Sequence, residues 1–213
     1  MRWGLWVVVV CGCGRVGFDV APPADDGAIG GDGMRDGVMP TTVGDMTVEG
    51  QGPDGHPPGS AEASSYYAAQ SGAVDRLVIY YDGTYPQDDA TALIAGLYAD
   101  DGSGNPGMLM AAATIQPGGQ LTAQTWYSAQ IPETAIVAHA YYWIAAACPF
   151  GTGTQCSFQY KYYGAIGSGA CTPTPAEQCT QHSAQSNLTV MPSTWSPGTV
   201  YLPSINSYYA THD

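Results

Sequence analysis

Short stretches in which apolar and polar residues alternate recur through residues 61–213, and clusters of Gly, Pro, Asp and Asn separate them. Successive side chains of an extended strand point to opposite faces of a sheet, so this alternation predicts strands. The clearest case is residues 73–81, AVDRLVIYY, in which Val74, Val78 and Tyr80 share one face. The same reasoning predicts strands over residues 64–70, 121–130, 135–147, 158–163, 199–202 and 205–211.

The stretch Leu93–Ile115 predicts a β-hairpin. Its two apolar arms flank residues 100–107, which contain three Gly and one Pro. Gly supplies positive φ, and Pro interrupts the ladder of backbone hydrogen bonds. Two short helices are the alternative, because Ala, Leu and Met also favour helix. The short, sharply bounded arms favour the hairpin, and the many short strands predict an all-β sandwich or barrel for residues 61–213.

A further pattern joins four segments: IAGLYADDGSGNPGMLMAAATI, QTWYSAQIP, AHAYYWIAAA and SYYAT. It resembles the pattern of a group of jelly-roll-like β-sandwich domains in secreted and surface-anchored bacterial proteins, and it covers most of residues 64–213. The resemblance implies a jelly-roll-like antiparallel β-sandwich, but no particular activity, since one fold supports many functions. His139 and Ala140 replace the usual small residue and Gly before Tyr142 and Trp143, so we expect a different turn there.

The N-terminal segment predicts an export signal. Arg2 precedes a short apolar run over residues 5–10, and small residues and Cys follow it. The run is much shorter than the about 20 apolar residues that span a bilayer. It resembles a bacterial lipoprotein signal, so we expect residues 1–13 to be a signal peptide with Cys13 lipidated. Cys11 is the alternative acceptor, and an ordinary cleaved secretory signal is the alternative signal.

A lipidated Cys13 would anchor the chain in the cell envelope, at the outer membrane, with the domain exported to an oxidising compartment. Residues 14–60 follow, rich in Gly, Pro and Asp and without a sustained apolar period. Such a segment cannot bury enough surface to offset the entropy of its ordering. We therefore expect a disordered linker over residues 14–60 and a β-sandwich domain over residues 61–213.

Composition and motifs argue against several classes of function. The chain has five Lys or Arg residues and a formal net charge of −13. This acidity argues against nucleic acid as a partner, because phosphate binding needs clustered cations. The sequence has no G-x-S-x-G elbow, no H-E-x-x-H motif and no P-loop. We therefore expect no enzyme, and we interpret His139, His182 and His212 as isolated structural or surface residues.

The four cysteines Cys148, Cys156, Cys171 and Cys179 predict two disulfides, because an even number in an exported chain is typical of disulfide bonding. Their pairing stays open between three arrangements, of which two local loops are the simplest. A zinc site is the alternative, and His182 is the one histidine near these cysteines in sequence.

The acidic turn at Asp100 and Asp101 is a candidate for structural calcium, although it lacks the Gly and Glu that an EF-hand loop needs. A plain acidic turn is the alternative. We expect no other cofactor.

The aromatic residues are the feature of the sequence that indicates a binding function. Tyr160 and Tyr162 share one face of a predicted strand, as do Tyr141 and Trp143. An exposed aromatic ring can stack on a sugar while its polar group hydrogen-bonds to hydroxyls. These residues predict a membrane-anchored binding module for a glycan, unless they serve only to pack the sheets. The alternative is a structural or adhesive envelope protein that contacts extracellular proteins through an apolar patch or a strand edge.

Overall fold

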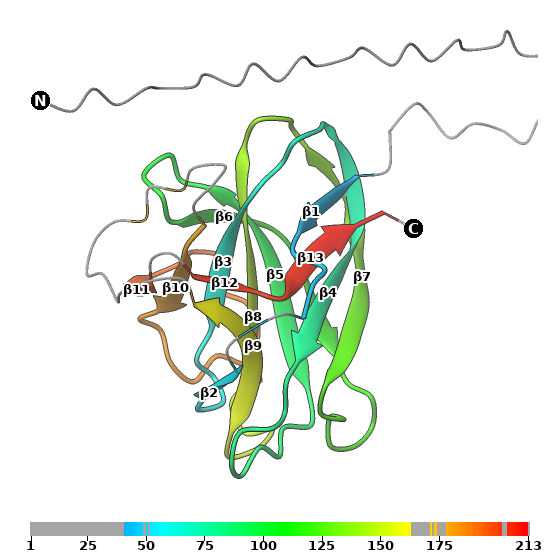
Figure 1. The fold of residues 1–213 in the computed structure, drawn as a ribbon, viewed down its shortest axis with the longest axis vertical. Helices are drawn as coiled ribbons and strands as arrows, with labels where there is room; N and C mark the ends of the chain where they lie inside the picture. The colour runs from blue at the N-terminus through cyan, green and yellow to red at the C-terminus, as the bar shows by residue number, and fades with distance from the viewer. Residues whose placement is uncertain are drawn as a thin grey trace, which may run out of the picture. The chain divides into compact units, whose positions relative to one another are not determined.

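A computed structural model describes residues 41–48, 50, 52–162, 171, 173, 178–201 and 204–212, all within the unit Asp36–Asp213. These residues form β-strands and contain no helix that could cross a membrane (Figure 1). The strands are β1 (Thr42–Gly44), β2 (Gly52–His56), β3 (Glu62–Tyr67), β4 (Gly72–Tyr81), β5 (Leu93–Asp100), β6 (Pro106–Ile115), β7 (Thr125–Ile136), β8 (Tyr141–Ala147), β9 (Cys156–Tyr162), β10 (Thr180–Ser183), β11 (Pro197–Tyr201), β12 (Ser204–Asn206) and β13 (Tyr208–Thr211).

The strands form two antiparallel sheets. The seven-stranded sheet has the order β1-β13-β4-β9-β12, with β7 paired to β4 and β2 paired to β9. The six-stranded sheet has the order β11-β10-β3-β8-β5-β6. The fold is therefore an all-β antiparallel sandwich of the class that the sequence predicts.

The main core contains the inward-facing rows of both sheets. From β4 it includes Leu77 and Ile79, and from β8 it includes Ile144, all with no measurable exposure. These residues sit at alternate positions of their strands, as strand geometry requires. Burial of such apolar surface is the main favourable contribution to folding.

A smaller core covers the other face of the six-stranded sheet. Trp143 of β8 and Tyr98 of β5 pack there with Met191 and Trp195, which come from the segment before β11. Both faces of β8 are thus buried. This double burial explains why β8 reads as a continuous apolar run, YYWIAAA, in place of an alternating one.

The predicted hairpin is confirmed as β5 and β6, which pair from Leu93 opposite Ile115 to Asp100 opposite Pro106. The single strand expected over residues 135–147 is wrong. Residues 135–136 end β7, and β8 begins only at Tyr141. His139 lies in the turn between them with a φ of 64°, the left-handed conformation that Gly adopts more readily.

The disordered linker expected over residues 14–60 extends too far. β1 pairs with β13, and β2 pairs with β9, so both strands belong to the seven-stranded sheet. Backbone pairing does not require apolar side chains, and the composition of this segment therefore concealed two strands. The expected signal peptide, Cys11, Cys13 and residues 14–40 lie outside the described residues.

Candidate functional site

The structure describes two of the four residues of the predicted aromatic ligand site, Tyr141 and Trp143. Trp143 has no exposed surface, because the segment around Met191 and Trp195 covers its face of the sheet. The prediction that Trp143 contacts a ligand is therefore wrong. Tyr141 is partly buried beside a depression that Asp100 also lines. The side chains of Tyr160 and Tyr162 lie outside the described part of the chain.

Asp100 and Asp101 close the turn between β5 and β6. Asp100 accepts a hydrogen bond from the backbone N–H of Gly102 at 2.8 Å and another from the Trp143 indole at 2.8 Å. Asp101 accepts from the backbone N–H groups of Ser103 and Asn105 at 2.7 and 3.1 Å. Both carboxylates thus satisfy local donors, as in an ordinary Asx turn.

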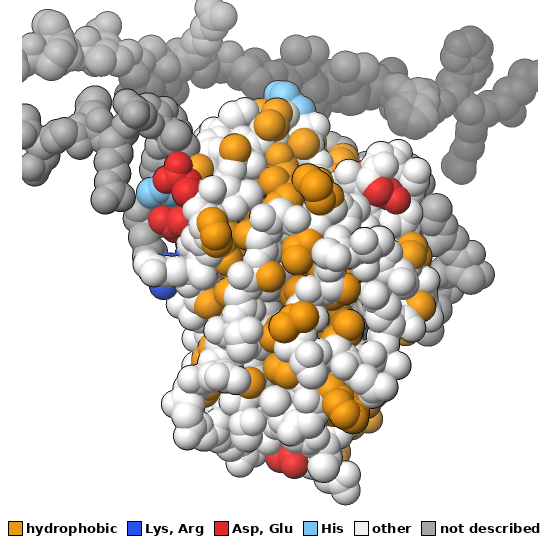
Figure 2. All heavy atoms as spheres, turned by 180° about the vertical axis from the view of Figure 1, so that it is seen from behind, with side chains coloured by type: hydrophobic (Ala, Val, Ile, Leu, Met, Phe, Trp, Pro, Cys, Tyr) orange, Lys and Arg blue, Asp and Glu red, His pale blue; other side chains and the backbone are white. Residues whose placement is uncertain are grey.

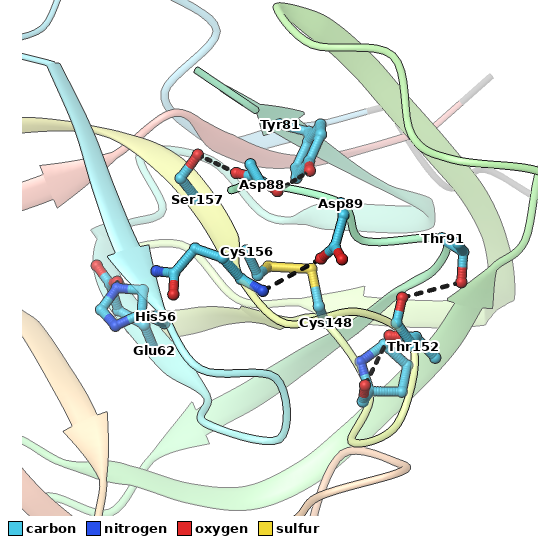
Figure 3. Close-up of a disulfide and its surroundings, with 12 residues drawn as sticks. His56, Glu62, Tyr81, Asp88, Asp89, Thr91, Cys148, Thr152, Cys156 and Ser157 are labelled. Atoms are coloured by element: carbon cyan, nitrogen blue, oxygen red, sulfur yellow. Dashed lines mark hydrogen bonds and ion pairs between the residues drawn. A yellow bond between two sulfur atoms is a disulfide. The ribbon is translucent and has the colours of Figure 1, made fainter. Parts of the chain in front are cut away.

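The cysteines pair as two local loops. Cys148 is bonded to Cys156 with a Cα–Cα distance of 6.0 Å, and Cys171 is bonded to Cys179 with a distance of 6.1 Å. These bonds leave the cysteines no role as zinc ligands. The first disulfide joins the end of β8 in the six-stranded sheet to the start of β9 in the seven-stranded sheet (Figure 3). Two disulfides are compatible with an oxidising, exported compartment.

Two aromatic rings, those of Trp126 and Tyr209, line a groove on the outer face of the seven-stranded sheet. Trp126 of β7 lies opposite Tyr80 of β4, with ring centroids 5.1 Å apart. Tyr209 of β13 also packs against Trp126, with ring centroids 5.4 Å apart. Both contacts are close to edge-to-face, the arrangement that aromatic pairs prefer. Trp126 thus contacts two rings, of which Tyr80 is buried and absent from the groove lining, while Tyr209 lines the groove with Trp126.

Polar side chains complete this aromatic groove. It has a volume of about 490 Å³ and is lined by Arg76, Val78, Trp126, Ser128, Tyr209 and Thr211. Nη1 of Arg76 donates to the Ser128 hydroxyl at 3.3 Å. Strand alternation predicts that Trp126 and Ser128 share a face, but only the packed structure shows that this face points outward.

A second cluster consists of Asp54, His56, Glu62 and His182. His56 and Asp54 come from β2 in the seven-stranded sheet, whereas Glu62 and His182 come from β3 and β10 in the six-stranded sheet. Glu62 and His182 are directly opposite each other in the strand register. The chain passes from one sheet to the other between His56 and Glu62, whose side chains lie side by side (Figure 3).

The potential ligand atoms of this cluster converge. Nε2 of His56 lies 2.7 Å from Oε2 of Glu62 and 3.4 Å from Oδ2 of Asp54. Nε2 of His182 lies 3.8 Å from the same Oε2, and the two imidazole rings are 4.7 Å apart. Taken together, one ligand atom from each of the four residues lies within 4.8 Å of all the others.

The cluster is an electrostatic unit inside the protein. Burial alone would raise the pKa of the Glu62 carboxyl, but His56, His182 and the Asn206 amide hold it well below its usual value. Burial would lower the pKa of His56, but the carboxylates of Asp54 and Glu62 raise it to about 10. Burial and the charge of His56 lower the pKa of His182. A buried, ionised carboxylate is therefore held between two imidazoles.

Sequence reasoning missed this cluster. It interpreted His182 as an isolated structural or surface residue, and the structure places this residue in a cluster with Asp54, His56 and Glu62. The sequence contains one local signal, since Pro57, Pro58 and Gly59 form a turn between His56 and Glu62. Nothing local connects residues 62 and 182. No protein-family model matches this chain, and no curated protein matches it.

Proposed function

We propose that the chain is an exported, non-catalytic binding module that takes a carbohydrate in its aromatic groove. The observation that carries this proposal is the pair of rings Trp126 and Tyr209, which line one groove together with polar groups. A sugar presents apolar C–H faces and a rim of hydroxyls. Aromatic rings can stack on the C–H faces. Arg76, Ser128 and Thr211 offer donors and acceptors to the hydroxyls.

The charge of the protein narrows the expected ligand class. A formal net charge of −13 disfavours the approach of polyanionic glycans, so a neutral polysaccharide is the better match. We further propose that a lipid on Cys13 anchors the module in the outer membrane. The lipobox-like sequence Val10-Cys11-Gly12-Cys13 supports this part of the proposal, together with disulfides of the kind that exported proteins form.

The test uses the full chain with its disulfides formed, on a glycan array and in pull-downs with insoluble polysaccharides. We expect binding to a neutral glycan, and a loss of at least tenfold in affinity in Trp126→Ala and Tyr209→Ala. Tyr85→Ala is the matched control, because Tyr85 is 42% exposed and lies outside the groove. Absence of binding to every glycan, or equal losses in all three variants, would contradict the proposal.

A structural or adhesive role is the second candidate. Figure 2 shows hydrophobic side chains along the middle of one face, with few charged side chains and these mostly near the margins. The side chain of Met108 is 71% exposed on β6, an end strand of the six-stranded sheet, and the backbone of Met108 forms a β-bridge with Thr194. Exposed edge strands can pair with other chains. Sedimentation at increasing concentration would show self-association that Met108→Lys reduces, whereas a monomer at all concentrations would argue against self-assembly.

A further inference from the structure

We propose that His56, Glu62 and His182 bind one divalent transition-metal ion of the zinc class, with Asp54 as the fourth ligand. This site is separate from the aromatic groove and shares no residue with it. The ion would join the two sheets, because two of these residues lie on β2 and the others on β3 and β10.

The spacing of the ligand atoms fits a four-coordinate ion. Ligands at about 2.0–2.1 Å from a tetrahedral zinc lie about 3.3 Å from one another. The observed separations of 2.7 Å between His56 and Glu62, 3.4 Å between His56 and Asp54, and 3.8 Å between His182 and Glu62 bracket that value. All four ligand atoms lie within 4.8 Å of one another, so the side chains would move inward to bind one ion.

The hydrogen bonding gives an independent argument. Within the described part of the chain, Nε2 of His56, Oε2 of Glu62 and Nε2 of His182 are buried and have no hydrogen-bond partner. Nε2 of His56 and Oε2 of Glu62 lie within ion-pair distance, at 2.7 Å, but without the geometry of a hydrogen bond. Buried polar atoms are almost always hydrogen-bonded, since an unsatisfied one destabilises the folded state. A metal ion would satisfy these three atoms together.

The other carboxylate oxygen of Glu62, Oε1, already accepts a hydrogen bond. Nδ2 of Asn206, from β12, donates a hydrogen bond to Oε1 of Glu62 and leaves Oε2 directed at the imidazoles. Carboxylate ligands in metal sites are commonly oriented by such a neighbour. Asn206 is therefore a positioning residue for the proposed site.

The donor types select the class of ion. Two imidazole nitrogens with two carboxylates suit zinc and its neighbours among the transition metals, whereas calcium and magnesium prefer oxygen ligands alone. Asp54 is the most accessible of the four residues, with 38% of its side chain exposed against 2% for Glu62. It marks the side from which an ion would enter.

The test titrates Zn²⁺ into the full chain after treatment with a chelator and dialysis, by calorimetry and by elemental analysis. We expect one Zn²⁺ per chain, a higher melting temperature with zinc than without, and no comparable effect of Ca²⁺. Co²⁺ should give the visible absorption of a four-coordinate ion with nitrogen and oxygen ligands. The proposal would be overturned if neither the chain as purified nor the chain titrated with zinc held one Zn²⁺ per molecule.

Variants separate this site from adventitious binding. His182→Ala should lose the bound zinc and the thermal shift, and its side chain is 20% exposed, which favours retention of the fold. His212→Ala is the matched control, because Nε2 of His212 also lies beside two carboxylates, at 3.8 Å from Asp75 and from Glu133. Zinc that persists in His182→Ala, or that is lost in His212→Ala instead, would overturn the assignment.

Glycan binding provides a readout that does not depend on zinc. We expect glycan affinity of His182→Ala to match that of the unaltered chain, because its position is absent from the groove. The two proposals therefore fail separately.

Discussion

The indole N–H of Trp143 donates a hydrogen bond to Oδ2 of Asp100 at 2.8 Å. The sequence suggested the ring as a sugar contact and the carboxylate as a calcium ligand, yet the two groups satisfy each other. The bond joins β8 to the end of β5, its neighbour in the six-stranded sheet. Trp143 is fully buried, so its N–H has no access to solvent.

Replacement of Asp100 by Ala tests this pair. Removal of the acceptor leaves a buried indole N–H unsatisfied, so we expect the free energy of unfolding to fall by about 1–3 kcal/mol. Urea denaturation provides the measurement. In a Trp143→Phe background the same replacement should cost less, because Phe has no N–H to satisfy. Equal costs in both backgrounds would show that the indole bond contributes nothing to stability.

Two glycines test whether β1 and β2 are part of the folded sheet. Gly44 has a φ of +130° and Gly52 a φ of +136°, so Ala at either position is strained. A Cβ at Gly44 would also collide with Tyr208 and Tyr209, whereas one at Gly52 would meet open space. Thermal melting should show that Gly44→Ala costs at least about 1 kcal/mol, clearly more than Gly52→Ala. Two neutral substitutions would restore the view that this segment is a linker.

The disulfide between Cys148 and Cys156 closes a loop with a sequence separation of 8 residues. Loop-closure entropy gives a stabilisation of about 2–3 kcal/mol for a loop of this size. The double variant Cys148→Ser and Cys156→Ser should therefore unfold at a lower urea concentration than the oxidised chain. The fully reduced parent chain serves as the control, and a variant as stable as the oxidised chain would contradict the prediction.

We expect the acidic turn at Asp101 to make the stability of the fold depend on pH. Burial alone would raise the pKa of Asp101, but hydrogen bonds from Asn105 and from the backbone of Ser103 hold it below 3.8. A carboxyl with a lowered pKa in the folded chain stabilises the fold above its unfolded pKa, and this stabilisation disappears as pH falls through the folded pKa. NMR titration of the Asp101 carboxyl should give a midpoint below 3.8, the usual value. A midpoint at or above that value would exclude the effect.

The effect of Asp101 can also be measured as the pH dependence of the free energy of unfolding. Asp101→Asn should flatten the acid end of the stability–pH curve, because Asn does not titrate. A curve identical to that of the unaltered chain would show that the hydrogen bonds of the turn do not favour the ionised form in the folded state.

Local patterns in the sequence predicted much of the fold. The alternation of apolar and polar residues predicted a strand over residues 73–81. Two apolar arms around a loop with Gly and Pro predicted a hairpin over Leu93–Ile115. The equal spacing of the cysteines favoured the two local disulfides that form. These features depend on residues near one another in the chain, and the sequence displays such relationships directly.

Alternation identifies which side chains share a face, but it does not identify what covers that face. Trp143 and Trp126 both lie in predicted strands, yet Met191 and Trp195 bury the first, while the second lines an outer groove. The covering segment lies about fifty residues beyond Trp143 in the printed sequence. No local pattern indicates that contact.

The sequence by itself determined the all-β class and the central hairpin, because each follows from the spacing of nearby residues, whereas it only made two local disulfides the simplest of three pairings. The tertiary structure alone decided the groove lined by Trp126 and Tyr209 and the cluster of Asp54, His56, Glu62 and His182. That cluster requires β10 to lie beside β3 and the chain to cross between the sheets after His56. Such pairings join residues far apart in sequence, and the packing of the whole domain fixes them.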